Sequence, residues 1–153
     1  MYDIFGEFDS AEEINAAAEG LFNEGDLDQL RNLGKENGIP EELVEAYING
    51  EIPFLADACI AACGKLDVEL PEAVEKYGKT AECLADYIKA RSEEETFARQ
   101  VRRKGKRLMD VLKYMEDEAR KSVKKRSGMQ VACIPPSEGF RMVRDYYQKG
   151  AKR

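Results

Sequence analysis

The sequence of 153 residues contains no histidine. Histidine is the side chain that most often transfers protons near neutral pH, so its absence weakens the case for an enzyme. The chain also lacks a nucleophile elbow, a phosphate-binding loop and a pair of metal-ligand motifs. Its carboxylates are numerous, but a surface carboxylate is far more often solvated than catalytic. We therefore expect a protein that binds rather than catalyses, with no catalytic residue and no cofactor.

Long apolar runs are missing as well. No stretch approaches the roughly 20 apolar residues that cross a bilayer, and Met1 to Ile4 lack the basic and apolar regions of a signal peptide. Hydrophobic residues make up 43% of the chain and charged residues 35%, which suffices for a core beneath a well-solvated surface. We expect a soluble cytoplasmic protein without membrane contact, built as one domain or as two small ones sharing a core.

Cysteine is scarce, with four residues in the whole chain. Without an export signal, free thiols are the expected state. Cys59 and Cys63 lie four residues apart on one face of a predicted helix, whereas Cys83 and Cys133 are single and distant. A zinc site usually needs a second close pair, so buried thiols are favoured over a metal site and no metal is predicted.

Acidic and basic residues are separated along the chain. Residues 1–75 hold nineteen Asp and Glu against three Lys and Arg, a net charge of −16. Residues 76–153 hold eleven acidic and twenty-one basic residues, a net charge of +10. We therefore divide the chain into an acidic half, 1–75, and a basic half, 79–153, which could share one continuous core. Either the halves simply attract each other, or one of them offers a face to a charged partner.

Helical signals predict a mainly α fold, a bundle of about six or seven helices. In the acidic half, three helices are expected at about 11–24, 27–36 and 40–48, each ended by glycine or Asn-Gly. Ser10 to Glu13 form a capping box before the first of them. Phe54 to Cys63 is apolar nearly all round, which predicts a short helix buried at the centre of the fold or at an interface. We expect Gly64 to end it and residues 71–78 to connect the halves.

The basic half is expected to begin with a helix at 79–91. A second capping box, Ser92 to Glu95, starts a helical pattern that continues to about residue 126. Unbroken, that helix would approach 50 Å, which exceeds the usual diameter of one small domain. Gly105 falls on its apolar stripe and marks either a bend or a close approach by another backbone. A short β strand or hairpin is expected at 130–134, followed by a last helix capped by Ser137.

Two charged faces are candidate binding sites. Like charges four residues apart, as in Arg99 with Arg103 and Arg103 with Arg107, each destabilise a helix by a few tenths of a kcal/mol. Phosphates or carboxylates from a partner would compensate them, although a solvated face is the simpler alternative. No stacking motif accompanies the cations, so sequence-specific readout of nucleic acid is not expected. This basic face comprises Arg99, Arg102, Arg103, Lys106, Arg107, Lys121, Lys124, Lys125 and Arg126.

The acidic face is the second candidate. Carboxylates on a helical surface can imitate a row of phosphates and occupy a basic groove. The alternative is that they cap helices and keep the protein in solution. The face comprises Asp3, Glu7, Asp9, Glu12, Glu13, Asp26 and Asp28.

A group of motifs near the C-terminus carries a family resemblance. Its parts are Glu118-Ala119-Arg120-Lys121, a basic turn at 124–128, the run Val131-Ala132-Cys133-Ile134, and a helix with Phe140, Val143, Tyr146 and Tyr147. With these motifs, residues 80–147 resemble the PcfK-like family, which includes type II anti-CRISPR proteins that inhibit Cas9. The acidic half, opening Tyr2-Asp3-Ile4-Phe5-Gly6-Glu7-Phe8, resembles proteins of mobile elements in gut bacteria.

The resemblance implies a protein of the bacterial host cytoplasm that binds Cas9, with or without guide RNA, and blocks DNA binding or cleavage. The acidic half would then occupy a basic nucleic-acid channel in competition with DNA. Alternatively, the basic half would hold nucleic acid, as in an accessory protein of a conjugative or mobile element. A third interpretation is a homodimer built on Phe54 to Cys63.

Overall fold

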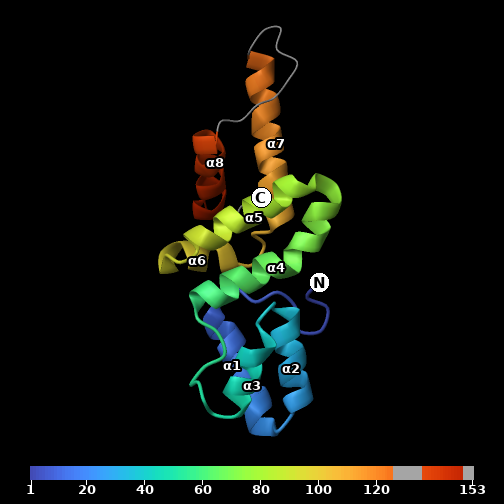
Figure 1. Ribbon diagram of the computed structural model, residues 1–153, viewed down its shortest axis with the longest axis vertical. Helices are drawn as coiled ribbons and strands as arrows, with labels where there is room; N and C mark the ends of the chain where they lie inside the picture. Colours follow the sequence, from blue (N-terminus) through green and yellow to red (C-terminus); the bar gives the residue numbers. More distant parts are fainter. Residues whose placement is uncertain (126–135, 150–153) are drawn as a thin grey trace.

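A computed structural model describes residues 1–125 and 136–149, and these residues form eight helices with no strand among them (Figure 1). The helices are α1 (Ala11–Glu24), α2 (Leu27–Glu36), α3 (Glu41–Ile48), α4 (Ala58–Tyr77), α5 (Lys79–Arg91), α6 (Glu95–Arg102), α7 (Leu108–Lys125) and α8 (Pro136–Gln148). The mainly α prediction is therefore confirmed. The strand or hairpin expected at 130–134 lies outside the described residues.

The first three helices begin and end where their capping residues predict. The Ser10 hydroxyl accepts a hydrogen bond from the amide of Glu13 (3.2 Å), and the Glu13 carboxylate accepts one from the amide of Asp9 (2.8 Å). α1 ends at Gly25, whose positive φ of 74° is a conformation that favours glycine. Asp26 then caps the first turn of α2 with its side chain. Local sequence signals therefore determine this part of the fold.

Two apolar clusters give the molecule an elongated shape, with α1 to α3 at one end and α5 to α8 at the other (Figure 1). α4 crosses between the two clusters and contributes to both. Ala61 packs into the cluster of α1 to α3, while Ala62 and Leu66 pack into the cluster of α5 to α8. The clusters therefore meet along α4, before the expected connector at 71–78. We call residues 11–57 the acidic lobe, since they hold twelve Asp and Glu against two Lys and Arg.

α4 is longer than predicted, because neither Gly64 nor Pro71 ends it. Gly64 is a contact point rather than a stop. A Cβ atom at this position would lie 2.2 Å from the carbonyl oxygen of Asn37, so only glycine lets α4 pack against the turn after α2. Pro71 removes one helical N–H, and α4 changes direction in its second half (Figure 1). Residues 71–77 of the expected connector form the last turns of α4 instead, and Gly78 separates α4 from α5.

The apolar segment Phe54 to Cys63 is only partly helical. Phe54 lies in the loop between α3 and α4 and is 52% exposed. Ala58, Ala61 and Ala62 are buried inside the chain by the two clusters. Of the two locations predicted for this helix, the centre of the fold is the one observed for its buried residues.

The long helix expected from residue 92 is broken into α6 and α7. The break falls at residues 103–107, where Gly105 has φ of 83°. A Cβ at Gly105 would meet no atom within 4 Å, so of its two predicted roles the bend is correct. The prediction that Ser92 to Glu95 form a second capping box is wrong. The Ser92 hydroxyl donates to the carbonyl of Ile88 (2.7 Å) and so ends α5 rather than starting the next helix.

Candidate functional site

Residues 1–10 form an extended arm that runs between the two ends of the molecule (Figure 1). The Glu36 carboxylate of α2 accepts hydrogen bonds from the amides of Ile4 (2.6 Å) and Phe5 (2.9 Å). Tyr2 is buried, and its hydroxyl donates to Glu69 Oε2 of α4 (2.9 Å). Burial and the Glu69 charge both raise the pKa of Tyr2, so its hydroxyl stays protonated. The arm therefore joins α2 to α4.

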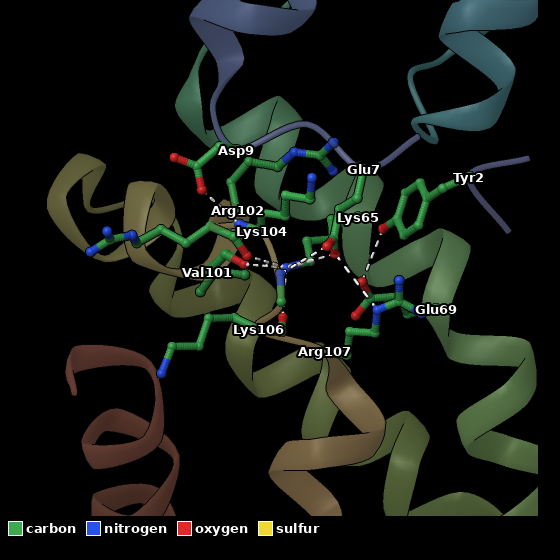
Figure 2. A network of polar contacts seen from close by, with 12 residues as sticks. Tyr2, Glu7, Asp9, Lys65, Glu69, Val101, Arg102, Lys104, Lys106 and Arg107 are labelled. Carbon is green, nitrogen blue, oxygen red and sulfur yellow. Dashed lines mark hydrogen bonds and ion pairs between the residues drawn. The ribbon is translucent and has the colours of Figure 1, made fainter. Parts of the chain in front are cut away.

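Lys65 lies at the centre of a polar network beneath this arm (Figure 2). Its side chain is fully buried, and its ammonium donates to the carbonyls of Val101 (3.1 Å), Arg103 (2.8 Å) and Lys106 (2.6 Å). The last carbonyls of a helix have no partner within it and carry partial negative charge, so a cation stabilises them. Burial lowers the pKa of Lys65 to about 8, although Glu69 and Glu7 oppose that shift. Lys65 thus fixes the end of α6 and the following turn.

Glu69 stands one helical turn after Lys65 on α4 and holds the beginning of α7. Its Oε1 accepts a hydrogen bond from the amide of Leu108 (2.8 Å), the first residue of α7. A carboxylate at a helix N-terminus satisfies a free amide and matches the helix dipole. Burial raises the pKa of Glu69, while Lys65 and the hydrogen bonds from Leu108 and Tyr2 act in the opposite direction. Lys65 and Glu69 together position the turn between α6 and α7.

Acidic residues of the arm close over the same turn (Figure 2). Glu7 Oε2 accepts from the amide of Gly105 (2.8 Å), and Asp9 Oδ1 accepts from the amide of Lys104 (2.8 Å). Glu7 Oε1 also lies 3.7 Å from both Lys65 Nζ and Arg107 Nε. Two acids of the predicted acidic face are therefore bound to the basic segment of their own chain.

The basic candidates at 99–107 are largely used inside the molecule. Arg99 forms ion pairs with Glu12 (2.6 Å) and Glu95 (2.9 Å). Arg102 is 1% exposed and donates to Asn37 Oδ1 (2.7 Å). Arg107 lies beside Glu7, as described above. Of these three residues only Arg102 is buried, while the side chains of Arg99 and Arg107 stay 48% and 42% exposed and pair with carboxylates of their own chain.

Lys106 is also buried, with its ammonium donating to the carbonyls of Tyr146 (2.8 Å) and Lys149 (2.7 Å) at the end of α8. Arg103 is exposed. Lys121 is exposed on α7 and pairs with Glu118 (3.1 Å). The side chains of Lys124 and Lys125, and the whole of Arg126, lie outside the described residues. The structure thus brings together Arg99 to Arg107 but does not join them to Lys121.

The remaining acidic candidates are spread over separate local contacts. Asp3 pairs with the amino group of Met1 (3.0 Å). Asp28 pairs with Arg31 (3.4 Å), and Asp26 and Glu13 act as caps. Their capping role was one of the two predicted alternatives. Of these residues, Glu13 contacts the backbone amide of Asp9, whereas the contacts of Asp3, Asp26 and Asp28 involve neither Glu7 nor Asp9.

A different acidic surface remains on the outside. Of the twelve Asp and Glu residues in the acidic lobe, ten are exposed, and only Glu36 and Glu45 are half-buried. Glu19, Glu24 and Glu42 are among the exposed ones, and their carboxylates make no hydrogen bond or ion pair within the described ranges 1–125 and 136–149. The lobe therefore presents a negative surface that its own two cations, Arg31 and Lys35, do not balance.

Sequence reasoning did not find the residues at the centre of the network. Lys65, Glu69, Tyr2 and Asn37 were not candidates, although Lys65 and Glu69 are spaced to share one face of a helix. One signal was available, because Lys65 is a single cation directly after an apolar run. A charge in that position is often buried and paired.

The described cysteines are free, with Cys59 and Cys63 half-buried and Cys83 exposed. Burial and the neighbouring Cys59 raise the pKa of the Cys63 thiol to about 11. Cys133 lies outside the described residues. Within 1–125 and 136–149, no group of three or more Cys, Asp or Glu is placed to hold a metal ion.

No helix in the described part of the chain is long and apolar enough to cross a membrane. No family model, no curated protein and no solved structure matches this chain.

Proposed function

We propose that the protein binds a macromolecule with a basic surface through the acidic lobe. The observation that carries this proposal is the outward position of ten of the twelve lobe carboxylates. A negative surface of this kind attracts basic grooves over several ångströms and speeds association with them. The proposal assigns no catalytic residue and no cofactor.

The partner named by the sequence resemblance is Cas9, alone or with its guide RNA, in the cytoplasm of a bacterial host. Cas9 holds nucleic acid in a positively charged channel and reads it through the backbone. Exposed carboxylates of the acidic lobe would occupy part of that channel in place of phosphates. DNA binding or cleavage would then be inhibited by competition, and inhibition would weaken as salt is added.

The second candidate function, nucleic-acid binding by the basic half of a mobile-element protein, has less support. Phosphate contacts need cations that reach outward. Arg102 and Lys106 are buried, and Arg99 and Arg107 are held by carboxylates of their own chain. Within residues 99–107, Arg103 and Lys104 are the remaining exposed cations, and two cations by themselves give only a weak phosphate-binding surface.

The test mixes the purified protein with Cas9 and guide RNA, then measures DNA cleavage and co-elution on a sizing column. We expect a complex and reduced cleavage. A lobe variant, Glu19→Gln with Glu24→Gln and Glu42→Gln, should lose most of both effects. Its matched control carries Glu72→Gln, Glu75→Gln and Glu82→Gln, which remove three exposed charges from α4 and α5. Unchanged cleavage and no complex at large molar excess would reject Cas9 as the partner.

A gel shift with duplex and single-stranded DNA at low salt tests the second function. Because the proposal places binding in the acidic lobe, no shift is expected. A shift that Arg103→Glu with Lys104→Glu abolishes would instead favour the nucleic-acid-binding function.

A further inference from the structure

A groove between the acidic lobe and the beginning of α6 has the chemistry of a docking site. It has a volume of about 470 Å³ and lies between the first turn of α1, the loop before α4 and the first turn of α6. Its lining includes Glu12, Phe54, Asp57, Glu93, Glu95 and Arg99. Three separate elements therefore contribute carboxylates to one concave surface.

The charge balance of the groove remains negative. Four carboxylates face one guanidinium, that of Arg99. The N-termini of α1, α4 and α6 also meet there, and each adds about half a positive charge. These dipoles reduce the negative charge without cancelling it, so a cationic group is favoured over an anion.

The groove already holds one guanidinium. Arg99 bridges Glu12 of α1 and Glu95 of α6 at 2.6 and 2.9 Å, while its side chain remains 48% exposed. Paired carboxylates at this spacing suit a planar guanidinium. Glu93 is exposed and has no hydrogen bond or ion pair among the described residues, so it is free to accept a second cation.

Phe54 gives the groove an apolar rim in a fixed position. It is 52% exposed, but its neighbour Leu55 is fully buried. The side chain of Asn15 in α1 holds the backbone of Ala56, the residue after Leu55. It accepts a hydrogen bond from the amide of Ala56 (2.9 Å) and donates one to the carbonyl of the same residue (2.8 Å). An exposed aromatic ring beside carboxylates suits an arginine, whose guanidinium stacks on the ring and whose stem packs against it.

We propose that this groove docks an arginine-bearing segment of a basic partner protein, with the guanidinium between Phe54 and Glu93. This inference rests on the proposed function and gives it a specific contact point. Charge complementarity and the guanidinium already held by Glu12 and Glu95 identify the occupant as a basic polypeptide.

The experiment uses a fluorescein-labelled peptide of alternating arginine and glycine, and follows fluorescence anisotropy at low salt. Phe54→Ala and Glu93→Gln should each weaken binding by about fivefold or more, whereas Phe22→Ala and the exposed Glu72→Gln should stay within about twofold. Phe22 is a matched control, because it is 42% exposed on the same lobe and does not line the groove. A peptide in which glutamine replaces arginine should not bind.

Three results would reject the groove as a docking site. They are no binding of the arginine peptide, equal losses of peptide affinity in the groove and control variants, or equal binding of the glutamine peptide. Such a result leaves the proposed function open to its own test, because Cas9 cleavage is measured separately with Glu19, Glu24 and Glu42 changed together. If Phe54→Ala does not change peptide binding while the triple variant no longer binds Cas9, the groove is not the docking site and the acidic lobe is still the binding surface.

Discussion

Replacing Lys65 with methionine tests the idea that one buried cation holds the turn between α6 and α7. Methionine matches the length of the lysine stem but cannot donate to the carbonyls of Val101, Arg103 and Lys106. A buried polar group left without its partner costs about 1–3 kcal/mol, and breaking a buried ionic network costs about 3–5 kcal/mol. We expect Lys65→Met to lower the free energy of unfolding by about 3–5 kcal/mol in urea titrations.

The pH dependence of the free energy of unfolding is a second and more specific test of the same variant. Burial lowers the pKa of Lys65 from 10.5 to about 8, so between these values the unfolded chain binds a proton that the folded chain has released. The free energy of unfolding therefore rises with pH, by about 1 kcal/mol between pH 8 and pH 9 for this group. The raised pKa values of Cys63 and Tyr2 act in the opposite direction only at about pH 9 and above.

In Lys65→Met this rise should be absent, while the exposed control Lys35→Met should keep it. Urea unfolding followed by circular dichroism at pH 8, 8.5 and 9 measures both effects. If the methionine variant stays within about 1 kcal/mol of the wild type and shows the same slope with pH, Lys65 does not have the role assigned to it.

Three further substitutions test the packing and the arm. Gly64→Ala should destabilise the fold by about 3 kcal/mol or more, because its Cβ would lie 2.2 Å from the carbonyl oxygen of Asn37. Gly20→Ala, in open space on α1, should instead stabilise it by about 0.5–1 kcal/mol, and thermal melts compare the two. Glu7→Gln keeps an acceptor for the amide of Gly105 but loses the attraction of two cations, so urea titration should show a loss of about 1–2 kcal/mol.

The acidic half of the fold could largely be predicted, because its helices begin and end at local signals. Ser10, Asp26 and Gly25 each act within one turn of the backbone, and the structure uses all three as expected. The same logic failed at Gly64 and at Ser92. Gly64 is determined by a tertiary contact, and Ser92 bonds to the turn before it rather than the turn after it. Tertiary packing, which a local pattern does not contain, decided Gly64, while Ser92 has a local alternative to capping that its sequence pattern does not distinguish.

The charge pattern predicted charged faces but not which of them would be exposed. Opposite charges lie far apart in the sequence, and only the fold shows that Glu7 and Asp9 close over residues 104–107. The same fold buries Arg102 and leaves most carboxylates of α1 to α3 exposed. Part of the charge separation along the chain is therefore used to join the two ends of the molecule, and the surplus in the acidic lobe remains for a partner.

Hydrogen–deuterium exchange of this protein, with and without the Cas9–guide complex, tests the binding surface most directly. Peptides from α1 to α3 and from the loop at 49–57 should become protected in the complex, while exchange at 103–107 and in α7 stays unchanged. Protection confined to α7 and α8, with the acidic lobe exchanging as it does alone, would contradict the account.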